Sequence, residues 1–315
     1  MSGSRRAAGA GNWRDLDQAA LDAAYDQAHW ASDMQAVLDA QRAASAAALA
    51  RLGPPQRVAY GSGVLEGIDL HRPARRGASM PLLVFVHGGA WRSGRAADYA
   101  FIAEPFLRAG ACVAIPDFSS VEETGGDLRP LAAQVRRAIG WLRREARGLG
   151  IDPRNIVSCG HSSGAHLAAV ALLGDDTAPD ASDDRLAPIR AALLVSGMYD
   201  LAPVRRSSRS RYVAFDDEVE QSLSPQRHLD RLRTPLVVAW GTRESPEFIR
   251  QARDFVSALQ ACAKPVRAIE IERDHFRILD EIARDDGLLA RELLAMLAAP
   301  PAQPTRTGAP DRPEP

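Results

Sequence analysis

The sequence predicts an α/β fold with a mostly parallel central sheet and helices on both of its faces. Two observations support this prediction. From residue 81 onward, short apolar runs alternate with longer segments of helical periodicity, and the connections between them are short. The apolar runs are also continuous, as in Leu-Leu-Val-Phe-Val at 82–86, which is typical of strands buried on both faces.

The part of the sequence before residue 81 predicts helices followed by a hairpin. Residues 16–52 are rich in Ala, Leu, Gln and Asp and contain neither Gly nor Pro, so we expect one or two helices there, ended by the Gly-Pro-Pro at 53–55. Residues 57–61 and 65–70 flank a glycine-containing turn, which predicts an antiparallel hairpin. A loop is expected at 73–80.

The alternating part of the chain supplies the remaining elements. Residues 128–149 place Leu131, Val135, Ile139 and Leu142 at helical spacing, whereas the Arg- and Ser-rich segment 203–211 is expected to be irregular. The predicted strands are 82–86, 112–115, 156–159, 191–196, 236–240 and 266–271, and the predicted helices are 99–109, 128–149, 165–173, 246–259 and 287–298.

These elements predict one domain, over residues 13–298. Residues 1–12 are small and polar, and residues 299–315 are rich in proline. Neither composition can form a packed core, so we expect both segments to be disordered.

Composition excludes several classes of partner. The 315 residues are 46% hydrophobic and 25% charged with a net charge of −1, so neither nucleic acid nor an anionic membrane is expected. No run approaches the roughly 18 apolar residues of a membrane span, and no export signal is recognised, so a cytoplasmic location is expected. The three cysteines show no ligand spacing, so we expect no metal and no cofactor. The expected partner is a small-molecule substrate, and the oligomeric state is left open.

One short motif points to chemistry. The apolar run 156–159 leads into Gly160-His161-Ser162-Ser163-Gly164, and a helix-like segment follows. A serine on such a strand–turn–helix corner has a strained backbone, and only small residues two positions away on either side avoid a clash. Ser162 is therefore the candidate nucleophile.

A serine nucleophile requires a base, and elimination among the seven histidines favours His275. His275 follows the last predicted strand directly, where a hydrolase with the chain order serine, acid, histidine presents its base. His166 lies one helical turn past Ser162 and is interpreted as a packing residue. His29 and His71 lie away from the strand ends, and His161 is expected to point elsewhere. His228 lies in a polar stretch that predicts a solvated loop or a capping role.

The acid should follow the penultimate strand. Glu244 does so and is the first choice, where it would orient the imidazole. Asp200, after the preceding strand, is the alternative acid. Asp274 adjoins His275 in sequence and would project differently.

The oxyanion donors complete the pattern. His87-Gly88-Gly89-Ala90-Trp91 ends the strand predicted at 82–86, and its two glycines let backbone N–H groups approach a developing oxyanion. The N–H of Ser163 would be the other donor. Together these features predict a serine hydrolase.

With these residues, the chain resembles the serine-dependent arylformamidases of the α/β-hydrolase fold, known as kynurenine formamidases, over roughly residues 16–297. The motifs that carry the resemblance lie at 60–70, 87–91, 160–168, 195–201, 244–248 and 274–276. The resemblance implies the α/β-hydrolase fold and hydrolysis of an N-formyl arylamine, with Ser162 as nucleophile, His275 as base and Glu244 as acid. The chain departs from the family at two positions: the family usually has Asp at the position of Glu244 and Ala at the position of Ser163.

The substrate pocket is less well defined by sequence. Trp91, Tyr199, Phe248 and Phe276 adjoin the catalytic motifs and are the candidate wall for an aryl group. The basic segment 205–211 could contact a substrate carboxylate or be a solvated loop. A carboxylesterase of short-chain esters is the alternative function, and a non-catalytic ligand-binding relative is the less favoured one.

Overall fold

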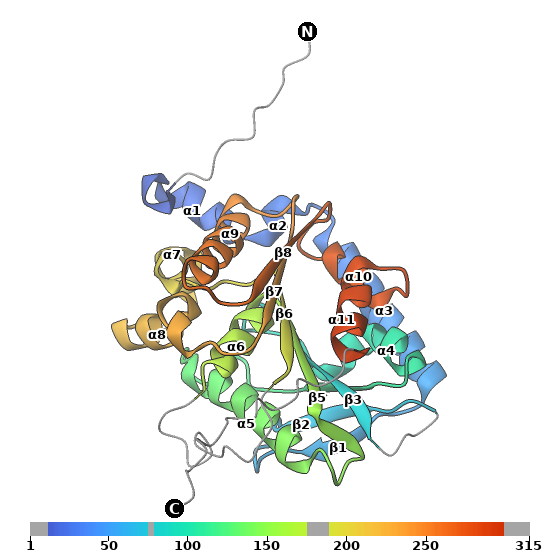
Figure 1. The fold of residues 1–315 in the computed structure, drawn as a ribbon. Coiled ribbons are helices and arrows are strands. Elements are labelled where there is room, and N and C mark those ends of the chain that lie inside the picture. The colour runs from blue at the N-terminus through green and yellow to red at the C-terminus, as the bar shows by residue number, and fades with distance from the viewer. Residues whose placement is uncertain (1–11, 75–78, 175–188, 299–315) are drawn as a thin grey trace, which may run out of the picture.

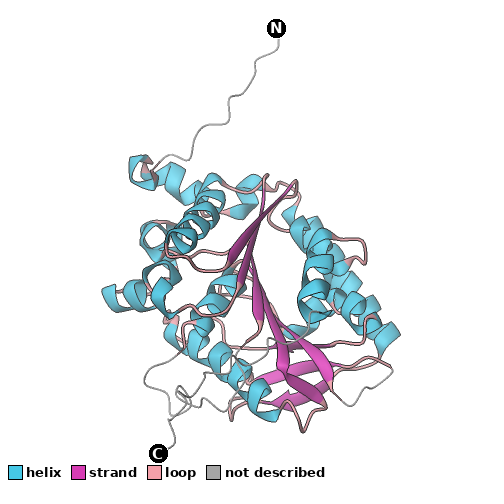
Figure 2. Cartoon of the chain, viewed as in Figure 1, coloured by secondary structure: helices cyan, strands magenta, loops and turns pink. Residues whose placement is uncertain are grey.

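An eight-stranded sheet forms the centre of the computed structural model, which describes residues 12–74, 79–174 and 189–298. The strands run in the order β1-β2-β4-β3-β5-β6-β7-β8, and Figure 2 shows the sheet in magenta between the helices. The disorder predicted for 299–315 and for nearly all of 1–12 concerns residues outside the described ones. The strands are β1 (Gln56–Ala59), β2 (Gly67–His71), β3 (Met80–Val86), β4 (Cys112–Pro116), β5 (Ile151–His161), β6 (Ala191–Val195), β7 (Leu236–Gly241) and β8 (Val266–Ile271).

The predicted mostly parallel sheet is confirmed. The hairpin β1–β2 is antiparallel, with Gln56 opposite Leu70, and β2 joins β4 antiparallel. From β4 to β8 all neighbours are parallel. The carboxyl ends of β3, β5, β6, β7 and β8 therefore meet at one edge, which is where ligands bind in sheets of this kind.

Helices cover both faces of the sheet (Figure 1). Alternate residues of β3 divide the core: Leu82, Val84 and Val86 belong to one apolar cluster, and Leu83 and Phe85 to the other. This explains the continuous apolar run in the sequence. The first cluster lies under α5 (Arg129–Glu145), α6 (Ser163–Leu172) and α9 (Pro246–Ala261), and the second under α4 (Glu104–Arg108), α10 (Asp280–Ala283) and α11 (Leu288–Ala298).

The N-terminal segment forms three helices, α1 (Gln18–Ala24), α2 (Gln27–Trp30) and α3 (Met34–Leu52), rather than the one or two expected. Two helices begin at aspartates, because the side chains of Asp17 and Asp26 accept hydrogen bonds from backbone N–H groups of the first turn. The prediction relied on the absence of Gly and Pro, and this criterion does not detect a helix that begins at a capping aspartate.

Two further segments differ from the predictions. The helix expected at 99–109 is a 3₁₀ segment, Ala96–Ile102, followed by α4, which begins at Glu104 and has Pro105 in its first turn. The segment 203–211, expected to be irregular, contains the end of α7 (Leu201–Arg206) and a 3₁₀ turn. Asp200 caps α7 with its side chain, a signal that sequence could have given. The remaining elements are α8 (Asp217–Ser222) and the 3₁₀ turns Trp13–Asp15, Ser208–Arg211, Pro225–Arg227, Leu229–Arg231 and Arg277–Leu279.

No helix among the described residues is long and apolar enough to cross a membrane.

A buried polar network joins the N-terminal segment to α9. The Tyr25 hydroxyl donates to Glu247 Oε2 at 3.0 Å and accepts from Gln251 Nε2 at 2.7 Å. The Arg250 guanidinium donates to both oxygens of Glu247 at 2.7 Å. Burial, followed by the charge of Glu247, raises the pKa of Tyr25, so the phenol stays protonated as a donor.

Replacing one member of this buried pair should be costly. We expect Glu247→Gln to lower the free energy of unfolding by ~2 to 3 kcal/mol, because the buried guanidinium of Arg250 loses its charge-assisted bonds to Glu247 and keeps the half-exposed Asp254 as its carboxylate partner. Urea unfolding measures the change. The matched control is Arg253→Gln, which breaks the exposed pair with Glu270 and should cost under about 1 kcal/mol. Equal losses in the two variants would contradict the role of the network.

Candidate active site

Ser162 stands at the corner between β5 and α6. Its backbone is left-handed, with φ 56° and ψ −125°, and its N–H donates to Val195 O at 2.8 Å. A Cβ at Gly164 would lie 2.2 Å from Val86 O, and one at Gly160 would lie 2.6 Å from Gly164 O. Both glycines are therefore required by close backbone packing, which holds the serine in its strained conformation.

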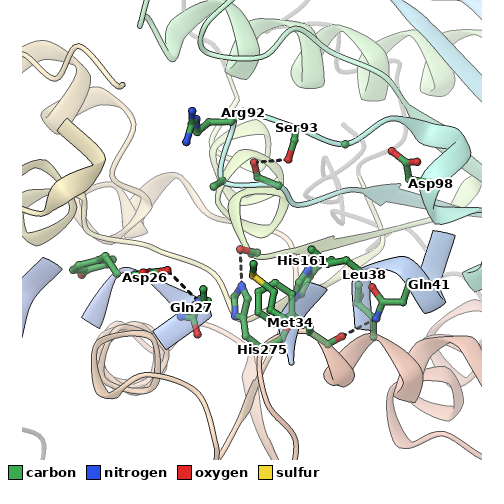
Figure 3. A pocket seen from close by; sticks show the side chains of 18 of the residues that line it. Asp26, Gln27, Met34, Leu38, Gln41, Arg92, Ser93, Asp98, His161 and His275 are labelled. Atoms are coloured by element: carbon green, nitrogen blue, oxygen red, sulfur yellow. Dashed lines mark hydrogen bonds between the residues drawn. The ribbon is translucent and has the colours of Figure 1, made fainter. Parts of the chain in front are cut away.

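The three residues predicted as a triad lie in one chain of hydrogen bonds. His275 Nε2 is 2.8 Å from Ser162 Oγ, and His275 Nδ1 is 2.7 Å from Glu244 Oε2 (Figure 3 shows His275 and the dashed bond to the serine). This arrangement fits the neutral imidazole that donates from Nδ1 to the carboxylate and accepts from the serine hydroxyl. All three side chains are buried.

Glu244 is held by two further donors. Its Oε1 accepts from the Ser196 hydroxyl at 2.6 Å and from the N–H of Gly241 at 2.6 Å. These bonds orient the carboxylate, so that the longer side chain of glutamate still presents Oε2 to the imidazole.

The alternative acids have other partners. Asp200 accepts from the N–H of Ala202, at the start of α7, and pairs with Arg227 at 3.4 Å. Asp274 accepts from the N–H groups of Phe276 and Arg277 and pairs with the Arg277 guanidinium. Asp200 thus caps a helix, and Asp274 stabilises the turn after His275.

The loop after β3 lies against the serine. Gly88 is so close that an added Cβ would lie 3.1 Å from Ser162 Cβ. Gly89, Ala90 and Trp91 all have positive φ, at 118°, 55° and 63°. Glycine adopts such a backbone readily, so the strain of this loop lies in Ala90 and Trp91.

Ser163 reaches this loop with its side chain. The N–H of Trp91 donates to Ser163 Oγ at 3.2 Å, and the Trp91 indole donates to His166 Nδ1 at 3.3 Å. His166 donates in turn from Nε2 to Leu223 O at 2.7 Å. The packing role expected for His166 agrees with these contacts, while the tether through Ser163 was not predicted from sequence.

Two histidines beside the site are kept neutral. Burial lowers the pKa of His166 to about 4. Burial, followed by the proximity of His275, lowers the pKa of His161 to about 3. His161 Nε2 is 2.8 Å from His275 O, so a neutral His161 can donate to and fix the backbone of His275.

A cavity of about 620 Å³ opens onto Ser162 and His275. Its walls include the N-terminal helices, the loop after β3, the segment around the 3₁₀ turn Ser208–Arg211, and the segment that follows His275. Figure 3 shows some of these lining side chains, among them Met34, Arg92 and His275. Its volume falls in the range of small-molecule sites.

The candidate aryl wall needs correction. Phe276 lines the cavity, but Trp91, Tyr199 and Phe248 are not among its described lining residues. They are buried behind it: Tyr199 stacks on Phe255 with centroids 4.1 Å apart, and Phe248 lies edge-on to His275 at 4.9 Å. Adjacency to a motif in sequence did not distinguish lining residues from packing residues.

The N-terminal helices supply lining residues that sequence reasoning missed. Met34, Leu38 and Gln41 line the cavity from one side of α3 (Figure 3), and Gln41 Nε2 donates to Phe276 O at 3.0 Å. Their spacing places them on one helical face, a signal that indicates a buried face but not what it faces.

Among the residues that the structure describes, no group of three or more His, Cys, Asp or Glu side chains is arranged to hold a metal ion.

A serine on a strand–helix corner, a histidine after the last strand and a carboxylate after the one before it define a serine hydrolase of the α/β-hydrolase fold. The sequence agrees with this class: residues 68–259 match the BD-FAE family. The chain belongs to the BD-FAE family.

Individual relatives are enzymes of hydrolytic type. The kynurenine formamidase of Danio rerio is 29% identical over 298 residues, which cover 91% of this chain and 98% of the relative. Esterase LipC of Mycobacterium tuberculosis is 29% identical over 230 residues, or 66% of this chain and 56% of the relative. A crystal structure of a candidate thioesterase from Silicibacter sp. TM1040 superposes with a TM-score of 0.73 at 25% identity, covering 89% of this chain and 99% of that one. The chain is a hydrolase similar to kynurenine formamidases.

The lowered pKa of His166 predicts a pH dependence of stability. Between pH 6.5 and about 4 the unfolded chain protonates this histidine and the folded chain does not, so stability falls as pH falls through this range. His166 alone should account for about 3 kcal/mol of that fall.

The variant His166→Asn should therefore show a shallower decline in the free energy of unfolding between pH 6.5 and 4, measured by urea titration at each pH. His29 is exposed, so His29→Asn is the control and should follow the wild-type slope. A wild-type slope in His166→Asn would disprove the buried neutral state of His166.

Proposed function

We propose that this hydrolase cleaves N-formyl arylamines, of the N-formylkynurenine type, to formate and the free arylamine. One observation carries the proposal above the others: the chain of hydrogen bonds Glu244–His275–Ser162 opens onto a cavity of small-molecule size. The kynurenine formamidase relative, matched over 98% of its length, supports the choice of substrate class.

In the proposed reaction, Ser162 Oγ attacks the formyl carbon while His275 Nε2 takes its proton. Glu244 stabilises the imidazolium that forms. Backbone N–H groups of Gly88 or Gly89 and of Ser163 stabilise the oxyanion. His275 then gives the proton to the departing arylamine nitrogen, leaving formyl-serine, and a water activated by the same histidine releases formate.

The position of the cavity supports this assignment, because it leaves room on the amine side of the substrate. The formyl group is the smallest acyl group and needs no room beyond the serine, so the cavity is left for the amine side of the substrate. Phe276, which was expected from sequence, provides apolar lining for an aryl ring together with Met34 and Leu38.

The alternative is a carboxylesterase of short-chain esters, favoured by the similarity to Esterase LipC. The same serine, histidine and acid would serve it, because only the leaving group differs. The fold and the bonds within the triad fit both reactions.

Variants of the triad test the catalytic roles. Ser162→Ala and His275→Ala should each lower kcat by about 10⁶-fold, and Glu244→Ala by about 10⁴-fold, as in a serine protease. Labelling with a fluorophosphonate should disappear in Ser162→Ala. The control is Asp200→Ala, which removes a helix cap and should retain kcat within about threefold. Loss of activity in Asp200→Ala with full activity in Glu244→Ala would reverse the choice of acid.

A substrate comparison tests the reaction. Purified protein should hydrolyse N-formylkynurenine with a kcat/KM at least comparable to that for p-nitrophenyl acetate, a short ester with a better leaving group. Formate release measures the first reaction and nitrophenolate absorbance the second. A formamide kcat/KM hundreds of times below the ester value would favour the carboxylesterase instead.

A further inference from the structure

Arg209 occupies an unusual place for a charged side chain. It lies in the 3₁₀ turn Ser208–Arg211, lines the cavity that contains Ser162 and His275, and is only 6% exposed. Its guanidinium carbon is 5.5 Å from the centroid of the Trp91 ring, the residue that ends the loop beside the serine. The charge is therefore buried against the catalytic loop.

The hydrogen bonds of Arg209 leave much of its guanidinium unused. Nη1 donates to the Tyr212 hydroxyl at 2.9 Å, and Nη2 donates to Tyr25 O at 3.0 Å. A guanidinium has five N–H donors, so three are left without an acceptor among the described residues, and the Nε atom is fully buried. Both acceptors are neutral.

Arg209 also makes no ion pair with any carboxylate of the described residues, unlike its neighbours. Arg205 pairs with Asp217 at 2.6 Å and Arg211 with Asp22 at 3.5 Å. The other cavity-lining arginines are matched as well, since Arg92 pairs with Glu122 and Arg42 with Asp39. Arg209 is therefore a buried arginine without a carboxylate partner among the described residues, whereas the arginines around it are paired.

The acidic residues of the cavity do not replace this missing partner. Asp26 accepts from the N–H of Ala28 at the start of α2, and Asp98 accepts from the N–H of Arg95. Burying a cation without a counter-ion costs several kcal/mol. A neutral side chain could donate the same hydrogen bond to Tyr25 O without the cost of burying a charge. The positive charge of Arg209 therefore indicates that the site binds an anion.

We propose that Arg209 binds a carboxylate on the substrate, and that the enzyme selects N-formyl arylamines that carry an anionic side chain. This inference rests on the proposed function for the reacting formamide, and it adds the chemistry of the substrate's other end. The planar fork of the guanidinium suits a carboxylate, because two parallel N–H donors can meet its two oxygens.

The test compares two formanilides that differ in one group. One carries an ortho side chain ending in a carboxylate, and the other has a primary carboxamide in its place. The measured quantity is the ratio of their kcat/KM values. Wild type should prefer the carboxylate, and Arg209→Met should lower the ratio by about 10- to 100-fold, mostly through KM, because a charge-assisted bond is lost.

Arg211→Met is the matched control. It removes an arginine two positions away whose side chain is 79% exposed, and the ratio should stay at the wild-type value. Arg209→Lys keeps the charge without the fork and should give an intermediate ratio. If circular dichroism shows Arg209→Met to be unfolded, Arg209→Gln supplies the same comparison.

An unchanged ratio in Arg209→Met, or a wild type without preference for the carboxylate, would overturn the inference and leave Arg209 a structural residue. The same side chains on a pair of phenyl acetates separate the two proposals. If wild type cleaves the acetates but neither formanilide, the formamidase function fails, and the acetate ratio still decides the role of Arg209.

Discussion

The close approach of α6 to the end of β3 is the constraint on which the active site depends. Gly164 allows the first turn of α6 to touch the carbonyls of Val86 and His87, where any side chain would force the two apart. This contact positions Ser162 at its corner and brings the loop after β3 beside it. Ser162 and the loop proposed to bind the oxyanion are thus positioned by one backbone contact, and the two glycine motifs that looked separate in the sequence form its two sides.

The sheet and the triad were predictable because their signals are local. Buried parallel strands must be continuously apolar, and chain order then determines which residues reach the carboxyl edge, so Ser162, His275 and Glu244 followed from position alone. Glutamate at position 244 can replace the usual aspartate, because Ser196 and Gly241 orient the longer side chain toward His275. Two predictions failed for different reasons. The helical state of 201–206 has a local signal, the cap at Asp200, that was overlooked. The burial of Tyr199 and Phe248 behind the cavity rather than in its wall is set by tertiary contact.

The cavity itself escaped prediction because two of its walls come from segments without a motif. The helical face of Met34 and Leu38 looks like any buried face, and only the fold shows that it covers the serine. The basic segment 205–211 had two interpretations from sequence, a contact to a substrate carboxylate and a solvated loop, and its arginines divide between a surface position and the cavity. Arg205 and Arg211 are paired on the surface, while Arg209 turns inward. No property of the sequence distinguishes one arginine of this run from the next.

The two bonds from Trp91 to α6 have a consequence for the energetics of turnover. Backbone and indole are each held by a residue of α6, Ser163 and His166, so the loop and the helix move as one body. In the proposed reaction, folding has therefore already oriented the N–H dipoles of this loop, and little reorganisation remains when charge develops on the substrate oxygen. A relative with alanine in place of Ser163 would have to order the same loop by packing alone.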